Sequence, residues 1–101
     1  MVSKVVWSKK AIEDLKDIYE YISKDSPKYG EMQILKIQET VKKLEKFPKI
    51  GKILIEFPKS YYKEIISGQY RIIYKIDNNE NTVYILAVIH GRQDLKKELP
   101  F

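Results

Sequence analysis

The sequence contains no cysteine and a single histidine, His90. Without cysteine the chain has no disulfide framework, no Cys-ligated zinc or iron–sulfur cluster and no thiol nucleophile, and one histidine cannot build a multi-histidine metal site. No stretch approaches the roughly 20 apolar residues of a membrane-spanning helix, and the N-terminus lacks a signal-peptide pattern. We therefore expect a soluble, cytoplasmic protein that needs no metal or other cofactor and has no membrane partner.

Glycine and proline are also scarce, with four of each among 101 residues, and no repeat or flexible linker divides the chain. Hydrophobic residues make up 44% of the sequence, which is enough to bury a core. A chain of this length is typical of one compact domain, so we expect residues 1–101 to form a single domain.

Arginine is rare among the basic residues. The formal net charge is +5, and of the 19 basic residues only Arg71 and Arg92 are arginines. The positive charge favours an acidic partner, either nucleic acid or an acidic protein surface. A guanidinium binds phosphate or carboxylate through two parallel hydrogen bonds, which an ammonium group cannot do. The two arginines are therefore the candidate anion-binding residues, with a structural ion pair as the alternative.

Two amphipathic helices follow a short N-terminal strand in the predicted order of elements. Residues 2–7 are β-branched and aromatic, which predicts a strand, and Ser8 is a suitable N-cap for a helix to about Lys24. Apolar residues recur in this helix at three- and four-residue steps, and charged residues such as Asp14 occupy its opposite face. Ser26 and Pro27 predict the start of a second helix, which ends near residues 47–48.

After residue 51 the hydrophobic spacing becomes strand-like, with predicted strands at 52–57, 61–67, 69–77 and 82–90. One strand, two helices and then three or four strands predict an α+β fold, in which the N-terminal strand and a helical hairpin pack on a small, mainly antiparallel sheet. We expect the hairpin to cover one face of this sheet and the other face to be open.

The last predicted hairpin brings candidate site residues together. If the chain folds back about Asn79, residue 70 lies opposite about residue 88, so Arg71 shares one end of the sheet with His90 and Arg92. Side chains alternate along a strand. The even-numbered residues from 70 to 76 are therefore expected in the core, and Arg71 on the other face.

Short segments in a fixed order carry a family resemblance over about residues 5–95. They comprise Trp7, Ala11, Asp14-Leu15, Tyr21-Ile22, Ile50-Gly51-Lys52, Glu56-Phe57, Tyr62 to Ile66, Gln69 to Tyr74 and Val88 to Leu95. Taken as an ordered set they resemble the RelE/ParE toxin superfamily of type II toxin-antitoxin systems. The ending His90-Gly91-Arg92-Gln93-Asp94-Leu95 is similar to the ParE-like branch, although a second arginine is common where this chain has Gln93.

The resemblance implies a plasmid-stabilisation type of toxin that inhibits growth and is neutralised by a cognate antitoxin in a hetero-oligomer. In the favoured ParE-like branch the toxin binds and poisons DNA gyrase and is not an enzyme. In the RelE-like alternative it is an mRNA interferase, a metal-free endoribonuclease that cleaves mRNA on the ribosome. A further alternative is a non-toxic module that only binds an antitoxin.

The nuclease alternative needs a base for the 2′-hydroxyl, cations for the phosphate and an acid for the leaving oxygen. Arg71 resembles the strand arginine that contacts the scissile phosphate in mRNA-cleaving relatives. Glu56 or Glu64 could serve as the base, and His90 as the acid. The alternative roles are structural: the two carboxylates pair with nearby lysines, and His90 ends its strand.

The same alternative assigns nucleic-acid binding on the open sheet face to Lys63, Arg71 and Arg92. The C-terminal tyrosine used by several nuclease members has no match in residues 92–101. The tail over residues 95–101, which includes Leu99, is expected either to dock on the core or to form part of a partner surface.

Overall fold

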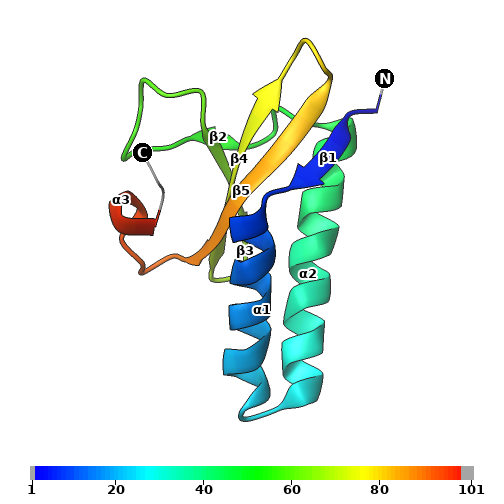
Figure 1. Ribbon diagram of the computed structural model, residues 1–101, viewed down its shortest axis with the longest axis vertical. Helices are drawn as coiled ribbons and strands as arrows, with labels where there is room; N and C mark the ends of the chain where they lie inside the picture. The colour runs from blue at the N-terminus through cyan, green and yellow to red at the C-terminus, as the bar shows by residue number, and fades with distance from the viewer. Residues whose placement is uncertain (1, 99–101) are drawn as a thin grey trace.

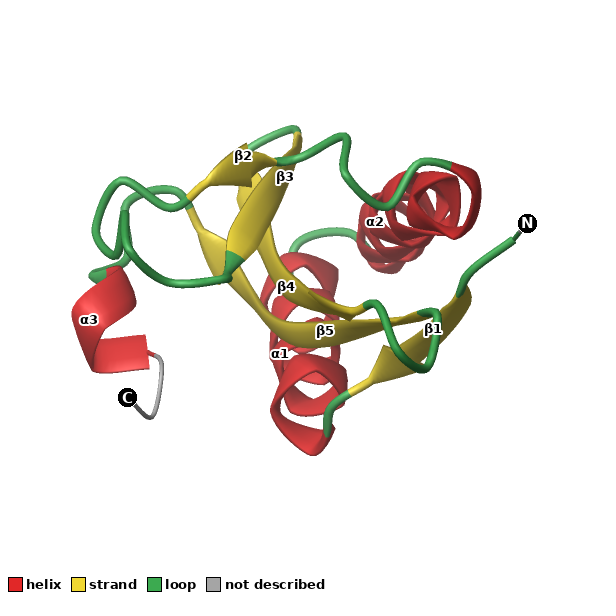
Figure 2. Ribbon diagram, turned by 90° about the horizontal axis from the view of Figure 1, so that it is seen from above, coloured by secondary structure: helices red, strands yellow, loops and turns green. Residues whose placement is uncertain are grey.

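The structure is a computed structural model and describes residues 2–98. These residues form β1 (Lys4–Trp7), α1 (Lys9–Ser23), α2 (Pro27–Lys46), β2 (Lys52–Ile53), β3 (Lys63–Ser67), β4 (Tyr70–Asp77), β5 (Thr82–His90) and α3 (Leu95–Glu98) (Figure 1). The predicted α+β class is confirmed: a helical hairpin packs on one face of a twisted sheet (Figure 2). No helix within the described residues is both long enough and apolar enough to cross a membrane.

The strands form one five-stranded sheet in the order β1-β5-β4-β3-β2. β1 pairs with β5 in parallel, and the other neighbours pair in antiparallel fashion. The sheet is therefore mainly antiparallel, as predicted. β1 begins at Lys4, two residues later than expected, and β3 begins at Lys63 rather than at residue 61.

Both long helices begin where the capping residues predict. The Ser8 hydroxyl accepts a hydrogen bond of 3.0 Å from the Ala11 amide, and the Ser26 hydroxyl accepts one of 3.2 Å from the Tyr29 amide. Each bond satisfies an amide that the first helical turn leaves without a partner. Pro27 occupies the first turn of α2, where its missing N–H is tolerated.

The pairing of β4 with β5 differs from the prediction by two residues: Tyr70 lies opposite His90, not opposite residue 88. A four-residue turn, 78–81, accounts for part of the shift. The rest comes from a β-bulge, because Ile73 pairs with Ala87 whereas Tyr74 pairs with Ile85, which leaves Leu86 unpaired in the ladder. The predicted grouping of Arg71 with the end of β5 is nevertheless confirmed.

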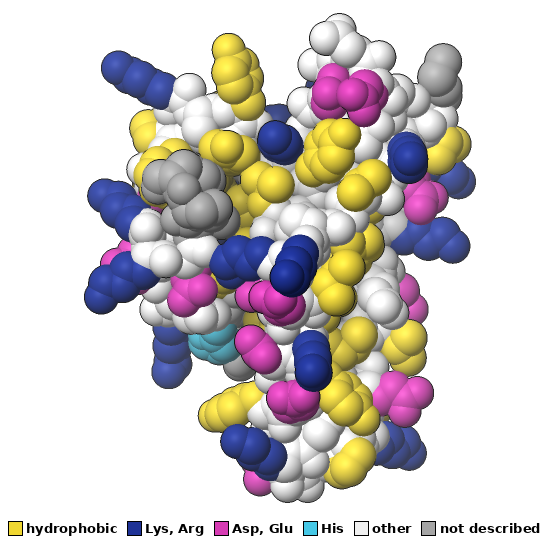
Figure 3. Space-filling model, in the orientation of Figure 1, with side chains coloured by type: hydrophobic (Ala, Val, Ile, Leu, Met, Phe, Trp, Pro, Cys, Tyr) yellow, Lys and Arg dark blue, Asp and Glu magenta, His cyan; other side chains and the backbone are white. Residues whose placement is uncertain are grey.

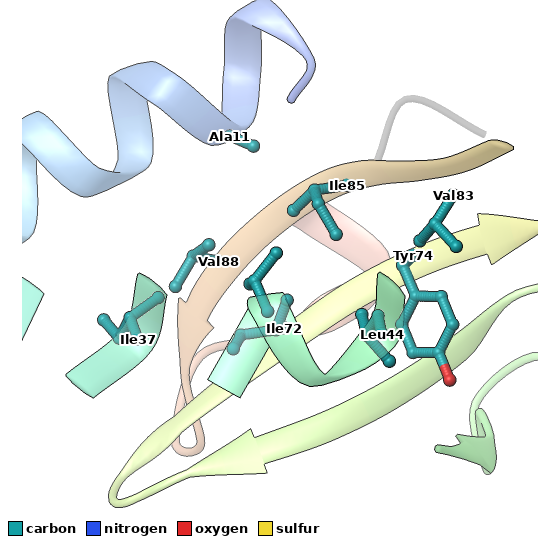
Figure 4. Packing of buried hydrophobic residues seen from close by; sticks show 9 residues of the cluster. Ala11, Ile37, Leu44, Ile72, Tyr74, Val83, Ile85 and Val88 are labelled. Atoms are coloured by element: carbon teal, nitrogen blue, oxygen red, sulfur yellow. The ribbon is translucent and has the colours of Figure 1, made fainter. Parts of the chain in front are cut away.

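The main core lies between the helical hairpin and the sheet (Figure 4). Alternation along β4 is confirmed, because Ile72 and Tyr74 are fully buried while Tyr70 and Ile76 pack at the edge of the same cluster. The buried members are Ala11 from α1, Ile37, Val41 and Leu44 from α2, and Ile72, Tyr74, Val83, Ile85 and Val88 from the sheet. Burial of each large aliphatic side chain contributes roughly 1.5–3 kcal/mol.

The prediction that the other sheet face is open was wrong. A second buried cluster covers part of it, formed by Leu54, Ile73, Ala87, Ile89 and Leu95. The predicted strand over 52–57 ends at Ile53, and the following segment, 54–62, turns back over this face through backbone hydrogen bonds from Phe57 to Leu54 and from Ser60 to Phe57. Leu54, the first residue after β2, is fully buried in this second cluster.

The start of the C-terminal tail docks on this second cluster. Leu95, at the beginning of α3, is 1% exposed and packs against the face of β5 opposite the long helices. Leu99 and the residues after it lie outside the described residues.

Candidate functional site

Arg71 is the centre of a cluster of three charged side chains on the sheet face opposite the long helices. Its Nη1 and Nη2 donate hydrogen bonds of 2.7 and 2.9 Å to the two carboxylate oxygens of Glu56, in the 54–62 segment. Its Nε donates a bond of 2.9 Å to the Glu64 carboxylate on β3, which Nη2 also contacts. We call these three residues the Arg71 cluster.

Burial strengthens the ion pairs of the Arg71 cluster. The exposed fractions of the Arg71, Glu56 and Glu64 side chains are 14%, 27% and 16%. The hydrogen bonds from Arg71 hold the pKa of Glu56 below its ordinary value, although burial opposes this shift. The same contacts raise the pKa of Arg71: the hydrogen bonds to Glu56 contribute most and those to Glu64 contribute less, while burial again opposes the shift. Both shifts favour the charged forms, so Arg71 and Glu56 face each other as a cation and a carboxylate near neutral pH.

This arrangement limits the chemistry that the Arg71 cluster can perform. A general base works best with a pKa near the working pH, whereas the pKa of Glu56 is lowered. A phosphate would have to displace both carboxylates from the guanidinium and would meet their like charge. Of the two roles expected for Arg71, the contacts are those of the structural ion pair.

His90 ends β5 beside the other arginine. Its Nδ1 accepts a hydrogen bond of 3.1 Å from the Arg92 amide, which leaves the ring proton on Nε2, 3.2 Å from the Gln69 side-chain oxygen. The ring also meets Tyr70 edge-on, with 5.6 Å between ring centroids. His90 is thus a fully hydrogen-bonded residue that holds the backbone of the 90–92 segment.

The structure brings most of the predicted site residues together and separates one. Arg71, His90 and Arg92 line a common hollow of about 510 Å³ beside Gly68. Lys63 is placed elsewhere, because it lies opposite Tyr74, whose side chain is in the helix-side core. It therefore emerges on the face opposite Arg71.

A second hollow of about 920 Å³ was missed by sequence reasoning. It lies where the helical hairpin meets the end of the sheet, and we call it the corner. Its lining includes Tyr21, Tyr29 and Gln33 from the helices, and Gln69, Tyr70 and Arg92 from the sheet end. The sequence feature that could have indicated this hollow is the presence of Tyr21 and Tyr29 on the polar faces of the two amphipathic helices.

Metal ligands do not gather in the described part of the chain. Within residues 2–98, no group of three His, Asp or Glu side chains is placed to hold a metal ion.

Comparisons with known proteins agree with the resemblance seen in the sequence. The family model described as the ParE toxin of the type II toxin-antitoxin system, parDE, matches residues 5–95. No functionally curated protein matches the chain in sequence.

Solved structures of several toxins share the fold, and three of them are described here. A chain of the toxin-antitoxin complex RelBE2 from Mycobacterium tuberculosis is 25% identical with a TM-score of 0.67, over 89% of this chain and 99% of that one. A chain of the chromosomal ParDE system from P. aeruginosa is 18% identical and has a TM-score of 0.72. The match covers 88% of this chain and 96% of that one. A mutant of the E. coli toxin RelE in the free state is 15% identical and has a TM-score of 0.62. The match covers 91% of this chain and 86% of that one.

Proposed function

The chain belongs to the ParE toxin family of type II toxin-antitoxin systems, and from this premise we propose that it inhibits growth by binding and poisoning DNA gyrase. In this proposal the chain acts through its surface and breaks no bond in a substrate. A cognate antitoxin neutralises it by forming a hetero-oligomer.

The observation that carries the proposal is the state of Arg71. Every nitrogen of its guanidinium donates to Glu56 or Glu64, whereas cleavage of RNA requires cations directed at a phosphate. Lys63 lies on the opposite face from Arg71. In the view of Figure 3, lysines and arginines are scattered around the molecule rather than gathered into one patch. These features support a binding toxin over a nuclease.

Ribosome-dependent RNA cleavage stays as the second candidate because of one observation. The hollow of about 510 Å³ brings Arg71, His90 and Arg92 to one end of the sheet. For this candidate, Glu56 and Glu64 would both have to release Arg71 when RNA binds.

An apolar groove on the helical hairpin supports the antitoxin part of the proposal. Ile12, Tyr19 and Leu35 are 56%, 40% and 50% exposed, and all three line a hollow of about 430 Å³. Exposed apolar side chains along a helix pair are suited to an amphipathic segment of a partner protein. The matched Mycobacterium tuberculosis structure is itself a toxin-antitoxin complex.

The proposal is tested by brief induction of the chain in a bacterial host, with growth, mRNA integrity and gyrase activity measured together. We expect growth arrest, intact transcripts in primer-extension mapping, and inhibition of supercoiling when purified protein is added to gyrase. The variant His90→Ala should retain the arrest. New translation-dependent cuts in mRNA would instead establish the nuclease, and unimpeded growth would leave the non-toxic binding module.

A further inference from the structure

Another exposed apolar surface lies at the edge of the sheet, where α2 leads into β2. Phe47, Ile50 and Ile53 are 61%, 54% and 56% exposed, and they belong neither to the two hydrophobic clusters nor to the groove on the helical hairpin. Four lysines accompany them along the chain or across the strand pair. We call these seven residues the β2-edge patch: Phe47, Ile50 and Ile53 with Lys46, Lys49, Lys52 and Lys63.

The local structure holds the three apolar side chains at one edge. Phe47 is the C-cap of α2, and its carbonyl accepts a hydrogen bond of 3.1 Å from the Ile50 amide, which closes a tight turn. The Gly51 amide fastens this turn to the sheet by donating to a buried tyrosine hydroxyl of β4. Ile53 then lies opposite Lys63, so their side chains emerge on the same face. The loop from α2 to β2 runs along the opposite side of the molecule from α1 (Figure 2) and lies at the far side of the view in Figure 3.

The patch is positively charged, and its lysines are unpaired. Residues 46–55 include three lysines and no acidic residue. None of the four patch lysines forms an ion pair with a carboxylate among the described residues. Lys52 lies opposite Glu64 in the strand pair, but the carboxylates of Glu64 and Glu56 are both bound to Arg71. The Arg71 cluster therefore leaves the patch lysines available to an anionic surface.

We infer that the β2-edge patch binds the surface of an anionic lipid bilayer. Its apolar side chains insert at the boundary between headgroups and acyl chains, and its lysines contact the headgroup phosphates. A peripheral contact of this kind needs no membrane-spanning helix, and the expectation of no membrane partner rested on the absence of such a helix. The inference goes beyond the proposed function, because it requires neither gyrase nor an antitoxin.

The shape of the patch favours a bilayer over a segment of a partner protein. A hollow of about 360 Å³ between Phe47 and Ile50 is lined, among the described residues, by 47–50 alone. No second element therefore closes it into a groove for a partner helix. β2 is two residues long, so a strand added at this edge of the sheet would gain few backbone hydrogen bonds. A bilayer surface requires neither a groove nor a long strand edge.

The types of side chain favour a bilayer over nucleic acid. All four cations are lysines, which act as point charges and lack the bidentate geometry of arginine. Two of the three apolar side chains are isoleucines, which offer no ring on which a base can stack. The long alkyl stem of a lysine can instead lie along apolar surface while its ammonium group stays at the level of the headgroups.

The test is flotation of the purified protein with lipid vesicles of two compositions. Vesicles of phosphatidylcholine alone are compared with vesicles that also contain phosphatidylglycerol. We expect binding to the anionic vesicles that weakens as salt rises, and little binding to the neutral ones. Each lysine near an anionic membrane contributes about fivefold in affinity, so the double variant Lys49→Ala/Lys52→Ala should weaken binding by about tenfold or more.

Matched variants separate the patch from general surface effects. Phe47→Ser removes the inserted ring and should weaken binding at least about fivefold. Tyr21→Ser is its control, because Tyr21 is also exposed but belongs to α1. Lys24→Ala/Lys28→Ala removes the same charge at the tip of the helical hairpin (Figure 1) and should bind much more strongly than the patch lysine variant. Circular dichroism verifies that each variant is folded.

Absence of binding to anionic vesicles, or equal binding by wild type and both patch variants, would overturn the inference. Loss of binding in the lysine variant with full retention in Phe47→Ser would also overturn it, because the chain would then adsorb to any polyanion. Phe47-dependent binding to an acidic amphipathic peptide, with none to vesicles, would replace the bilayer by a protein partner. If growth arrest occurs without vesicle binding, the bilayer inference fails and the proposed function stands.

Discussion

Arg71 and Glu56 form a bidentate ion pair, with nitrogen–oxygen distances of 2.7 and 2.9 Å, that joins β4 to a segment 15 residues earlier in the chain. Next to Glu56, Phe57 packs against the second hydrophobic cluster. The ion pair therefore holds the 54–62 segment over the sheet face that would otherwise be open. We therefore expect this pair to fasten the segment in the folded protein.

Removal of the arginine should destabilise the fold, because Glu56 and Glu64 would be left as partly buried carboxylates without a cation. We expect Arg71→Ala to lower the free energy of unfolding by about 1–3 kcal/mol, less than for a fully buried pair. Urea unfolding at neutral pH measures this change. Arg92→Ala is the control and should stay within about 0.5 kcal/mol of wild type. An unchanged midpoint for Arg71→Ala would contradict the fastening role.

The same ion pair predicts an acid-dependent loss of stability. The pKa of Glu56 is lower in the folded protein than its ordinary value of 4.5, so at acidic pH the unfolded chain binds more protons at this site than the folded chain. Its contribution is fully present above the unfolded pKa and is lost as pH falls through the folded pKa. Stability should therefore decrease as the pH falls below about 4.5, the ordinary pKa of this carboxyl.

Glu56→Gln isolates this linkage. The variant cannot ionise at this position, so wild type should be more stable near neutral pH and the two proteins should converge as acid protonates Glu56. Chemical denaturation of both proteins at several pH values gives the difference directly. A constant difference at all pH values would mean that the ionised form of Glu56 makes no special contribution.

Gly51 lies too close to its neighbours to accept a side chain. A Cβ atom at this position would be 2.4 Å from the Glu64 carbonyl oxygen and 2.4 Å from the Tyr74 hydroxyl, and the Gly51 amide donates a bond of 2.9 Å to that hydroxyl. Because Tyr74 is fully buried, we expect Gly51→Ala to cost about 1–3 kcal/mol. Thermal unfolding should show a decrease in Tm of several degrees.

Gly91→Ala is the matched control for this prediction. A Cβ atom at Gly91 would lie 3.4 Å from the nearest neighbour, the Gln69 carbonyl oxygen, which is an ordinary contact. Its Tm should therefore change much less than that of Gly51→Ala. Equal decreases in Tm for the two substitutions would contradict a special cost of the close approach at Gly51.

Asp14 should matter more than a surface carboxylate normally does. Its side chain accepts a hydrogen bond of 2.9 Å from the Val88 amide on β5, in addition to an ion pair of 3.0 Å with Lys10. β1 ends opposite Ile85. Beyond that point the hydroxyl of Ser8, the N-cap of α1, donates to the Leu86 carbonyl, and Asp14 of α1 accepts from the Val88 amide. Asp14→Ala would leave the Val88 amide unpaired and should cost about 1–3 kcal/mol in urea unfolding. Asp14→Asn keeps an acceptor and should cost less.

The capping residues and the hydrophobic periodicity were sufficient to predict α1, α2 and β5. Ser8, Ser26 and Pro27 act within one helical turn, and β5 spans the predicted residues 82–90. Alternation similarly identified the core face of β4. These predictions succeeded because the interactions that decide them lie within a few residues along the chain. The ordered motifs identified the family for the same reason, since they can be read without knowledge of contacts.

Tertiary structure alone decided how distant side chains pair. The bulge at Leu86, the return of residues 54–62 over the sheet, the bond from Val88 to Asp14 and the double carboxylate contact of Arg71 join segments far apart in sequence. Each depends on which arrangement buries much apolar surface while leaving few buried polar groups unpaired. That balance is a property of the whole molecule, so spacing along the chain predicted Arg71 as an anion-binding residue without revealing that protein carboxylates occupy it.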